Sequence, residues 1–318
     1  MAPRDYTPTA PKPYDFVSIE PLREGDRQRP KGHERYHPDT VSGLLEAALI
    51  VATPLHVASG DIHLRPDNRT PLVRALARVN DVPCIPASTV KGLVRSVVES
   101  ITHSCVRITR ARNEQLPPGA AGCKRKENLC LACRMFGSLG FEGHVRFDDA
   151  LLTEGKPAIA RMPALYAPRS RTGAYFSGRD VKGRKFYKHG RTVVDSQTPV
   201  EIIRPESRLS LTLRFDNLSV GELGVLLTAL GVGEPPLMLK LGGGKPACYG
   251  SFLVQAQALR VWENPQQLYG AYDDAEHSAL EAQTCFEAAR ELIVKRNLEK
   301  LAQIWEYDMG RTCPEGNY

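Results

Sequence analysis

Within residues 208–218 (RLSLTLRFDNL), four apolar side chains alternate strictly with polar ones, namely Leu209, Leu211, Leu213 and Phe215. A period of two places every second side chain on the same face of a strand, so this pattern predicts a strand with one buried face. A second strand is expected within residues 44–57 (LLEAALIVATPLHV), which carry branched apolar residues and few charges, although the alanines also permit a helix. A sheet is therefore the first element that this chain is expected to build.

Segments with helical spacing alternate with these strands. Residues 83–101 repeat apolar side chains at a spacing near that of an α-helix, and Ser88 or Thr89 can cap its start. A short helix is expected around residues 223–230, and one long helix over residues 275–304, which are rich in Ala, Glu, Leu and Gln. The chain thus mixes helices and strands along its length.

The order of these elements predicts an α+β fold. Residues 144–152 (HVRFDDALL) alternate like a further strand, and residues 239–259 indicate a glycine turn that enters another. The order of strand, helix, strand, then strand, helix, strand fits a ferredoxin-like unit that carries large insertions. Residues 1–43 are rich in Pro, Arg, Asp and His and are expected to form an extended N-terminal arm.

The composition limits the class of protein. The chain of 318 residues holds 42 Lys and Arg against 36 Asp and Glu, and its formal net charge of +6 favours an anionic partner. No run approaches the roughly 18 apolar residues of a membrane helix, and the N-terminus lacks an apolar signal core, so a cytoplasmic protein without a membrane partner is expected. Eight cysteines lack the density of a secreted disulfide scaffold, and reducing cytosol would keep them as thiols or metal ligands.

Three of the cysteines form a C-x6-C-x2-C pattern at Cys123, Cys130 and Cys133. Zinc takes about four such ligands in a tetrahedron, and either Cys105 or His103 is expected to supply the fourth. A complete set of protein ligands leaves no open position, so this zinc is predicted to be structural. The alternative is a group of ordinary buried thiols. Four other cysteines are expected to be of that ordinary kind: Cys84, Cys248, Cys285 and Cys313.

Two further features are typical of RNA-binding surfaces. Gly242, Gly243 and Gly244 offer unobstructed backbone amides beside Lys245, which suits a phosphate, although a plain glycine turn between strands is the alternative. Residues 161–204 combine many basic side chains with aromatic ones, as sequence-tolerant single-strand binders require. A solvated mobile loop is the alternative for this basic tract. The sequence offers histidines and aspartates for catalysis but no recognisable hydrolase motif.

Six stretches of the chain carry a resemblance. They are TPLHVASGD (53–61), IPASTVKGLVRS (85–96), CLACRMFGS (130–138), HVRFDDA (144–150), GRKFYKHG (183–190) and LGGGKPACYGSF (241–252). Together and in this order they resemble the repeat-associated mysterious protein (RAMP) superfamily of CRISPR proteins, and within it the backbone-subunit group of type III and related systems. Each stretch alone is degenerate, but the ordered set is specific.

The resemblance implies a fold and a role. It implies an RRM-like palm over residues 44–260, a zinc-binding insertion at about residues 103–140, a thumb-like β-hairpin at about residues 161–205, and a C-terminal helical segment over residues 261–318 that packs on the palm. The protein would bind guide RNA, stack with further copies of itself along it, and present it to complementary target nucleic acid. A capping subunit of the same superfamily and a separate nuclease are the other implied partners.

The resemblance also assigns roles to residues. In the family, the stretch that matches residues 85–96 starts a helix whose side chains meet the RNA backbone, and here these are Ser88, Lys91 and Arg95, with Lys91 and Arg95 expected on an outward face. The full set expected to bind RNA is Ser88, Lys91, Arg95, Arg161, Arg169, Arg171, Lys182, Lys185, Tyr187, His189, Gly242, Gly243, Gly244, Lys245 and Tyr249.

One departure from the family bears on activity. Slicing members carry an aspartate two residues before a proline in the loop ahead of that helix, and Arg69 stands at this position here. This favours a binding subunit that works with a separate nuclease, as in type VII and type IV systems. The alternative is a metal-dependent endoribonuclease that slices target RNA at regular intervals with Asp67 or Asp61 as a carboxylate. A zinc-stabilised scaffold that touches only protein is a third interpretation.

Overall fold

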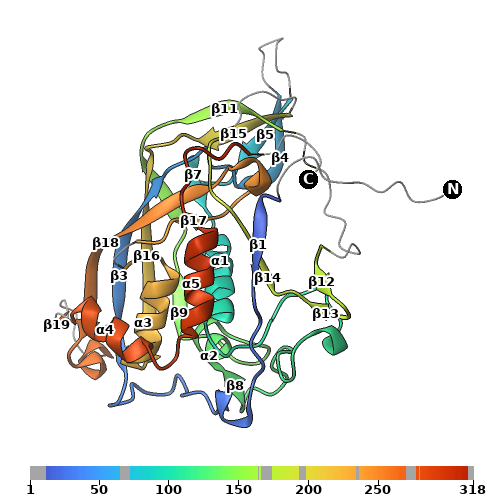
Figure 1. Cartoon of the computed structure of the whole chain (residues 1–318). Helices are drawn as coiled ribbons and strands as arrows, with labels where there is room; N and C mark the ends of the chain where they lie inside the picture. Colours follow the sequence, from blue (N-terminus) through green and yellow to red (C-terminus); the bar gives the residue numbers. More distant parts are fainter. Residues whose placement is uncertain are drawn as a thin grey trace.

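The structure is a computed structural model of the chain, and it describes residues 12–64, 72–163, 165, 174–192, 198–233, 236–269, 277–278 and 280–313. Within these ranges the protein combines two main sheets with a group of helices (Figure 1). The expected mixed α+β class is confirmed. None of the described helices is long and apolar enough to cross a membrane.

The larger sheet has nine strands and forms the centre of the molecule. Its three long strands are β3 (Val41–Val51), β16 (Arg208–Leu218) and β18 (Ser251–Trp262), with β3 in the middle. Both pairings of β3 are antiparallel. The predicted alternation of β16 is confirmed, because its apolar side chains from Leu209 to Phe215 are fully buried.

The remaining strands of this sheet are short. The order across the sheet is β17-β18-β3-β16-β10-β7-β6, with β9 also paired to β16 and β19 to β18. Residues 144–152, expected as one strand, form two strands with Asp148 and Asp149 between them. The bounds of the short strands are β6 (Arg78–Val79), β7 (Val82–Ile85), β9 (Val145–Phe147), β10 (Ala150–Glu154), β17 (Leu239–Lys240) and β19 (His277–Ser278).

Helices gather on one face of the larger sheet (Figure 1). The helices α1 (Ala87–Ile101) and α3 (Val220–Ala229) contact each other, α4 (Ala282–Ala289) packs on α3, and α5 (Lys295–Ile304) packs on α1. The buried apolar side chains of the sheet and these helices form one continuous cluster. The main core therefore lies between the sheet and the helical layer.

The start of α1 differs from the sequence prediction. The N-cap residue is Pro86, which has no side-chain cap, and the backbone amide of Ala87 donates to Asp149 Oδ1 at 2.6 Å. The expected cap by Ser88 or Thr89 is therefore wrong. A carboxylate from the interruption between β9 and β10 takes the capping role, which only the tertiary structure could bring there.

The long C-terminal helix expected over residues 275–304 is also wrong in its length, because the structure has two helices there, α4 and α5. Between them, Ile293 forms an antiparallel bridge with Thr102, the residue that follows α1. This pairing takes the backbone out of helical geometry. The bridge joins two segments that are far apart in the sequence, so the apolar spacing within residues 275–304 could not predict it.

The smaller sheet has four strands in the order β11-β15-β5-β4 and lies at the top of Figure 1. Its strands are β4 (Ala58–Leu64), β5 (Leu72–Leu76), β11 (Pro157–Met162) and β15 (Thr198–Ile203), and only the pairing of β15 with β5 is parallel. A small core of its own packs this sheet against the glycine-rich loop, with Tyr249 at its centre.

The basic tract of residues 161–205 only partly forms the expected hairpin. The strands β11 and β15 do pair antiparallel at its two ends. Between them, however, β14 (Arg184–Tyr187) pairs with β1 (Tyr14–Val17) near the start of the chain. The described residues of the tract therefore do not form a single projecting hairpin, because the strand in its middle pairs with the N-terminal strand β1.

The described part of the N-terminal arm is packed rather than extended away from the molecule. Besides β1, the strand β2 (Arg27–Gln28) pairs with β8 (Leu129–Cys130). Tyr14 and Val17 of β1 are buried. The remaining short elements are α2 (Leu131–Phe136), β12 (Phe176–Ser177), β13 (Asp180–Val181) and four 3-10 helices, η1 (Glu24–Asp26), η2 (Asn113–Gln115), η3 (Lys245–Ala247) and η4 (Pro265–Tyr269).

Candidate metal centre and nucleic-acid interface

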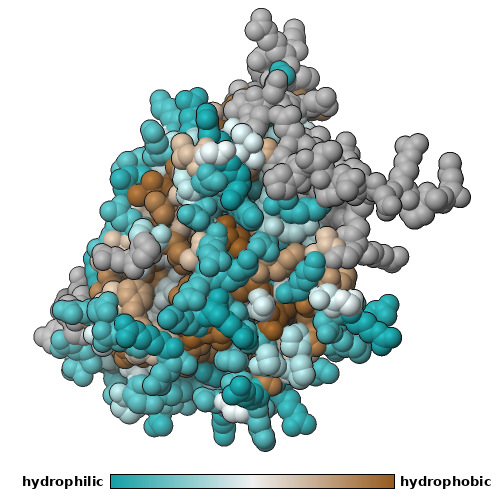
Figure 2. All heavy atoms as spheres, viewed as in Figure 1, coloured by the Kyte–Doolittle hydropathy of each residue, from teal (hydrophilic) through white to brown (hydrophobic). Residues whose placement is uncertain are grey.

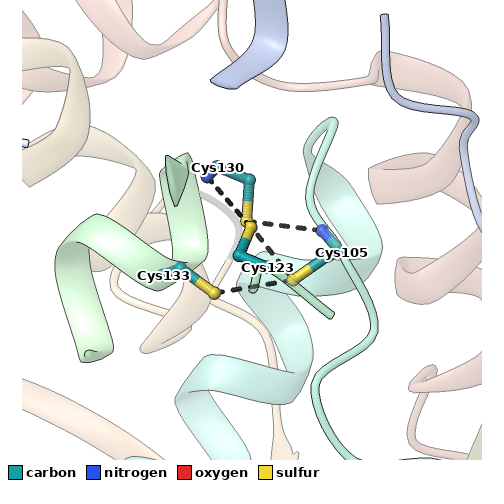
Figure 3. Close-up of side chains that lie close together, drawn as sticks. All are labelled: Cys105, Cys123, Cys130 and Cys133. Atoms are coloured by element: carbon teal, nitrogen blue, oxygen red, sulfur yellow. Dashed lines mark hydrogen bonds between the residues drawn. The ribbon is translucent and has the colours of Figure 1, made fainter. Parts of the chain in front are cut away.

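Four cysteine side chains point toward one another between α1 and α2 (Figure 3). Cys105 follows α1, Cys123 lies in the insertion, and Cys130 and Cys133 flank the start of α2. Their sulfur atoms all lie within 4.8 Å of one another, and all four residues are buried. The fourth member of the cluster is Cys105, whereas His103 is half-buried and its Nδ1 lies 3.3 Å from the carbonyl of Pro21.

The geometry of this cluster suits zinc. With Zn–S bonds of about 2.3 Å, the sulfur atoms of a tetrahedral site lie roughly 3.8 Å apart. The Sγ atom of Cys105 lies 3.5 Å from that of Cys133 and 3.5 Å from that of Cys130. Hydrogen bonding between Cys105 and Cys123 raises the pKa of the Cys105 thiol and lowers that of the Cys123 thiol. The buried thiols thus share protons that a divalent cation would replace.

Two guanidinium groups support the cluster from outside. Arg95 Nη2 donates to Cys133 Sγ at 3.2 Å, and Arg95 Nη1 donates to the carbonyl of Gly137 at 2.8 Å. Burial works against the charge of Arg27, but a hydrogen bond to Cys123 together with the charges of Cys123, Cys130 and Cys105 raises the pKa of this guanidinium. Positive groups at this position would offset the excess negative charge of four thiolates around one zinc ion.

Arg95 therefore points inward, and its expected place on an outward face is wrong. Its Nε also donates to Glu99 Oε1 at 2.7 Å, so three of its nitrogen atoms are engaged inside the protein. The side chain of Glu99 is only 2% exposed and binds a second guanidinium, that of Arg184 in β14. One buried carboxylate thus connects α1, β14 and the cysteine cluster.

The exposed part of α1 is its first turn. Ser88 is exposed and Lys91 is half-buried, one turn further along the helix. Burial, with a smaller contribution from the charge of Arg95, lowers the pKa of Lys91. An ammonium that is already partly desolvated gains more from an anion than a fully hydrated one. Ser88 and Lys91 are therefore the residues of the expected helix set that remain available to a phosphate.

The glycine-rich loop is shaped by close backbone contacts. Gly242 and Gly244 have φ angles of +85° and +70°. A Cβ atom at Gly242 would lie 2.5 Å from the carbonyl oxygen of His56, and one at Gly244 would lie 2.7 Å from Met162 Sδ. The glycines are thus required by packing as well as by conformation. This finding supports the structural alternative for the loop, a glycine turn that packs between strands.

Lys245 closes the same loop. Its Nζ donates to the carbonyl of Gly242 at 2.8 Å, and burial lowers the pKa of its ammonium. Gly242 and Gly243 are half-buried, while Gly244 is buried. The accessible part of the expected glycine-loop set is therefore Gly242, Gly243 and Lys245.

Two expected RNA-binding residues are buried instead. His189 is 0% exposed, with Nδ1 2.8 Å from Ser251 Oγ and Nε2 3.0 Å from the carbonyl of Met238. Tyr249 is 2% exposed and directs its hydroxyl toward the carbonyl of Arg161 at 3.4 Å. Instead of facing outward, these two side chains connect β17, β18 and the smaller sheet.

The aromatic part of the basic tract binds its own lysine. Lys185 Nζ lies 4.5 Å from the ring centroids of Tyr14 and Tyr187 and 5.2 Å from that of Tyr175. Burial, followed by the charge of Lys245, lowers the pKa of Lys185 to about 8. Such cation–π contacts stabilise the docking of β1 on β14. Lys185 and Tyr187 are therefore occupied within the protein, although they were expected to meet RNA.

The other expected basic residues fall into two groups. Arg161 and Lys182 are exposed. Arg169 and Arg171 lie outside the described residues, as do Asp67 and Arg69, on which the question of slicing depends. Asp61 is exposed on the edge strand β4.

Sequence reasoning also missed a disulfide between Cys248 and Cys313, which were expected to be separate thiols and are 65 residues apart.

Comparisons with known proteins show which family this chain belongs to. A family model described as the RAMP superfamily matches residues 49–252. The matched stretch begins within β3, ends within β18, and contains α1, the cysteine cluster and the glycine-rich loop. The chain belongs to the RAMP superfamily. This RAMP assignment confirms the resemblance and supports an RNA-binding component of a CRISPR effector complex as the general class.

A solved structure gives a more distant likeness for this RAMP protein. It is a chain of the type III-B Cmr-beta complex bound to cognate target RNA, with 16% identity and a TM-score of 0.37. The likeness covers 70% of the present chain and 61% of the Cmr-beta chain, so the RAMP protein spans less than two thirds of that chain's length. A search of curated proteins found no match.

Proposed function

We propose that this RAMP protein is a backbone subunit that binds guide RNA in a multisubunit CRISPR effector complex. The observation that carries the proposal is the family match over residues 49–252, which includes both the start of α1 and the glycine-rich loop. Copies of the chain would stack along the guide and present it to complementary target nucleic acid. A capping subunit of the same superfamily and a separate nuclease would complete the complex.

The strand order supports a palm of the RRM-like kind. The strands β18, β3, β16 and β10 are neighbours in one antiparallel sheet. Helix α1 follows β3 in the chain, and α3 connects β16 to the region before β18. Strand, helix, strand, strand, helix, strand with this order is the ferredoxin-like arrangement. We infer that these elements form the palm and that the cysteine-rich insertion and the smaller sheet are built onto it.

The available cationic side chains define the proposed RNA contacts. Ser88 and Lys91 would meet RNA phosphates at the start of α1, and Lys245 would do so in the glycine-rich loop. Arg161, within β11, and Lys182, between β11 and β15, are two of the exposed basic residues of the tract of residues 161–205. Arg95, His189 and Tyr249 are left out of the proposal, because their polar atoms are engaged inside the fold. Most of the proposed binding energy is then electrostatic and independent of base sequence.

In this proposal, zinc would have a structural role. Cys105, Cys123, Cys130 and Cys133 would hold it, and a complete set of thiolates leaves no position for a water or substrate. Its chemistry would be the crosslinking of the insertion to the end of α1. Because Arg95 contacts both Cys133 and Glu99, the metal would also fix the helix that carries Ser88 and Lys91.

The test is the affinity for single-stranded RNA and its dependence on salt. In the double variant Lys91→Gln with Lys245→Gln, we expect weaker binding and a slope of log affinity against log salt that is shallower by about 0.7 for each phosphate that the protein no longer neutralises. Fluorescence anisotropy with a labelled oligonucleotide at several salt concentrations measures both. The double variant should still melt cooperatively and retain its metal.

The matched control is Lys156→Gln with Lys295→Gln, which removes the same charge from two exposed lysines that lie outside the first turn of α1 and the glycine-rich loop. It should leave the slope close to that of the unchanged protein. An unaltered affinity and slope in the Lys91 and Lys245 double variant would refute the proposed RNA contacts.

A further inference from the structure

A small basic pocket lies where the two ends of the described chain meet. It has a volume of about 230 Å³ and is lined by Lys12, Lys188 and Arg311 together with the Cys248–Cys313 disulfide. The glycine-rich loop residues and the start of α1 do not line it. The pocket thus has a lining of its own beside the proposed RNA contacts, and the amide of Cys248 in that lining donates to the carbonyl of Lys245 at 3.2 Å.

Backbone pairing builds the walls of this pocket. The amide of Lys188 donates to the carbonyl of Pro13 at 2.9 Å, and the amide of Arg191 donates to the carbonyl of Arg311 at 3.0 Å. Arg311 Nη1 also donates to the carbonyl of His189 at 3.1 Å. Gly190 is needed between these contacts, since a Cβ atom there would lie 2.8 Å from the carbonyl oxygen of Arg311. The pocket is therefore a fixed feature of the fold.

The charges that face the pocket are predominantly positive. Among the described residues that line it, three are cationic and none is acidic. Of two acidic groups in this region, Asp308 pairs with a cation of the pocket itself, with 3.8 Å between its Oδ2 and Arg311 Nη2, while Asp15 pairs with Lys300 at 2.7 Å. A concave surface with charges of one sign concentrates the electric field and attracts counter-ions.

A buried lysine behind the pocket adds to this field. Lys240 is 3% exposed, and its Nζ donates to Ser251 Oγ at 3.2 Å. Burial, followed by the charges of Lys245 and Arg311, lowers the pKa of Lys240 to about 7. Arg311 thus lines the pocket and also acts through its charge on a buried amine whose charged form an anion would stabilise.

We propose that this pocket binds a phosphate group through Lys12, Lys188 and Arg311. Its volume is below the roughly 300–1,000 Å³ of sites that enclose a drug-sized molecule, so one small anionic group fits better than a whole ligand. Arg311 has five N–H donors, one of which holds the carbonyl of His189, and the two lysines add charge without fixed direction, which is a combination suited to phosphate oxygens. The phosphate would come from a free small molecule or from the end of an RNA strand.

The direct test is a calorimetric titration of the full chain with inorganic phosphate in a chloride background. We expect saturable binding that weakens by about tenfold or more in Lys188→Gln with Arg311→Gln, because this variant lacks two charge-assisted hydrogen-bond donors. Since Arg311 also holds the C-terminal segment, Lys12→Gln with Lys188→Gln serves as a second variant that leaves that hydrogen bond in place. Arg290→Gln with Lys295→Gln, which alters one arginine and one lysine on exposed sites, is the matched control.

Two further titrations distinguish the sources of the phosphate. If an oligonucleotide with a 5′-phosphate binds the unchanged protein more tightly than one with a 5′-hydroxyl, and the pocket variants abolish the difference, the pocket takes the end of an RNA strand. If the two oligonucleotides bind alike while adenosine monophosphate displaces inorganic phosphate, the pocket takes small phosphates. The proposal is overturned if inorganic phosphate shows no saturable binding, or if the pocket and control variants bind it equally.

Discussion

At the residue scale, the buried carboxylate of Glu99 is expected to contribute strongly to the stability of the fold. It accepts hydrogen bonds from Arg95 on its own helix and from Arg184 on β14, and its side chain is 2% exposed. Replacing Glu99 by a neutral residue would therefore destabilise the fold, since it leaves the positive charge of two guanidinium groups buried without compensation. The same carboxylate orients the arginine that contacts Cys133.

We therefore predict that Glu99→Gln destabilises the protein by about 3–5 kcal/mol, the usual cost of breaking a buried ion pair from one side. Urea denaturation followed by circular dichroism measures this change in the free energy of unfolding. The control is Glu299→Gln in α5, which removes an exposed partner 3.8 Å from Lys295. That change should stay within about 0.5 kcal/mol. Similar values for the two variants would contradict the assigned role of Glu99.

The residue scale also shows where sequence reasoning was insufficient. The C-x6-C-x2-C spacing was enough to predict three members of the cysteine cluster, while the sequence left the fourth open between Cys105 and His103. Arg95 falls on the polar side of α1, but no local pattern shows that the insertion folds over this side and takes the guanidinium inward. The burial of His189 likewise depends on Ser251 and on the carbonyl of Met238, which lie far away in the sequence.

At the scale of elements, the cysteine-rich insertion meets the end of α1 at the four-cysteine cluster rather than through long strands. Its described regular elements are short, with β8 of two residues, α2 of six and η2 of three. Segments with so little backbone pairing have low local stability on their own. A bound metal would then supply much of their order.

Accordingly, we expect the purified protein to contain about one zinc ion per chain, and Cys133→Ala to lose it. Loss of the metal should open the insertion, so trypsin should cut faster between residues 107 and 126, which contain several Lys and Arg. Metal analysis and timed proteolysis give the two readouts. Cys84→Ala is the control, because Cys84 is also buried but lies outside the cluster. Zinc retained in Cys133→Ala would contradict the ligand assignment.

The elements themselves were predictable to different degrees. The strand at residues 208–218 and the helix from Ala87 followed from their own periodicity. The interruption between α4 and α5 did not, because it is caused by pairing with the end of α1. In the same way, β14 was expected in a free hairpin, but Tyr14 and Phe16 of β1 lie about 170 residues earlier in the sequence and provide its partner.

At the scale of the whole molecule, several buried basic groups make the fold sensitive to acid. Burial is the largest cause that lowers the pKa of His189 to about 3, followed by the charge of Lys240. Burial, followed by the charge of His33, lowers the pKa of His144 to about 4. In the unfolded chain these histidines titrate near 6.5. Below that pH the unfolded state therefore binds more protons than the folded state.

We predict that the free energy of unfolding falls as the pH is lowered from 7 to 5, with each of these histidines contributing up to about 1.4 kcal/mol per pH unit below about pH 6.5. Urea denaturation at several pH values measures the slope. His189→Asn should reduce the slope whatever its effect on stability at pH 7. His103→Asn, at a half-buried histidine, should not change it. A slope that is the same in all three proteins would show that His189 has no part in acid sensitivity.

Figure 2 shows how hydrophobic residues are distributed over one face of the molecule. Hydrophilic side chains dominate its lower part, and hydrophobic ones are visible between them near β1 and β14. The segments outside the family match, β1 and α5 among them, cover apolar residues there, and Val17 and Leu301 are 0% exposed. A fragment trimmed to residues 49–252 would lose this cover and most of β3. Such a fragment would present open strand edges and is expected to precipitate, so expression should use the whole chain.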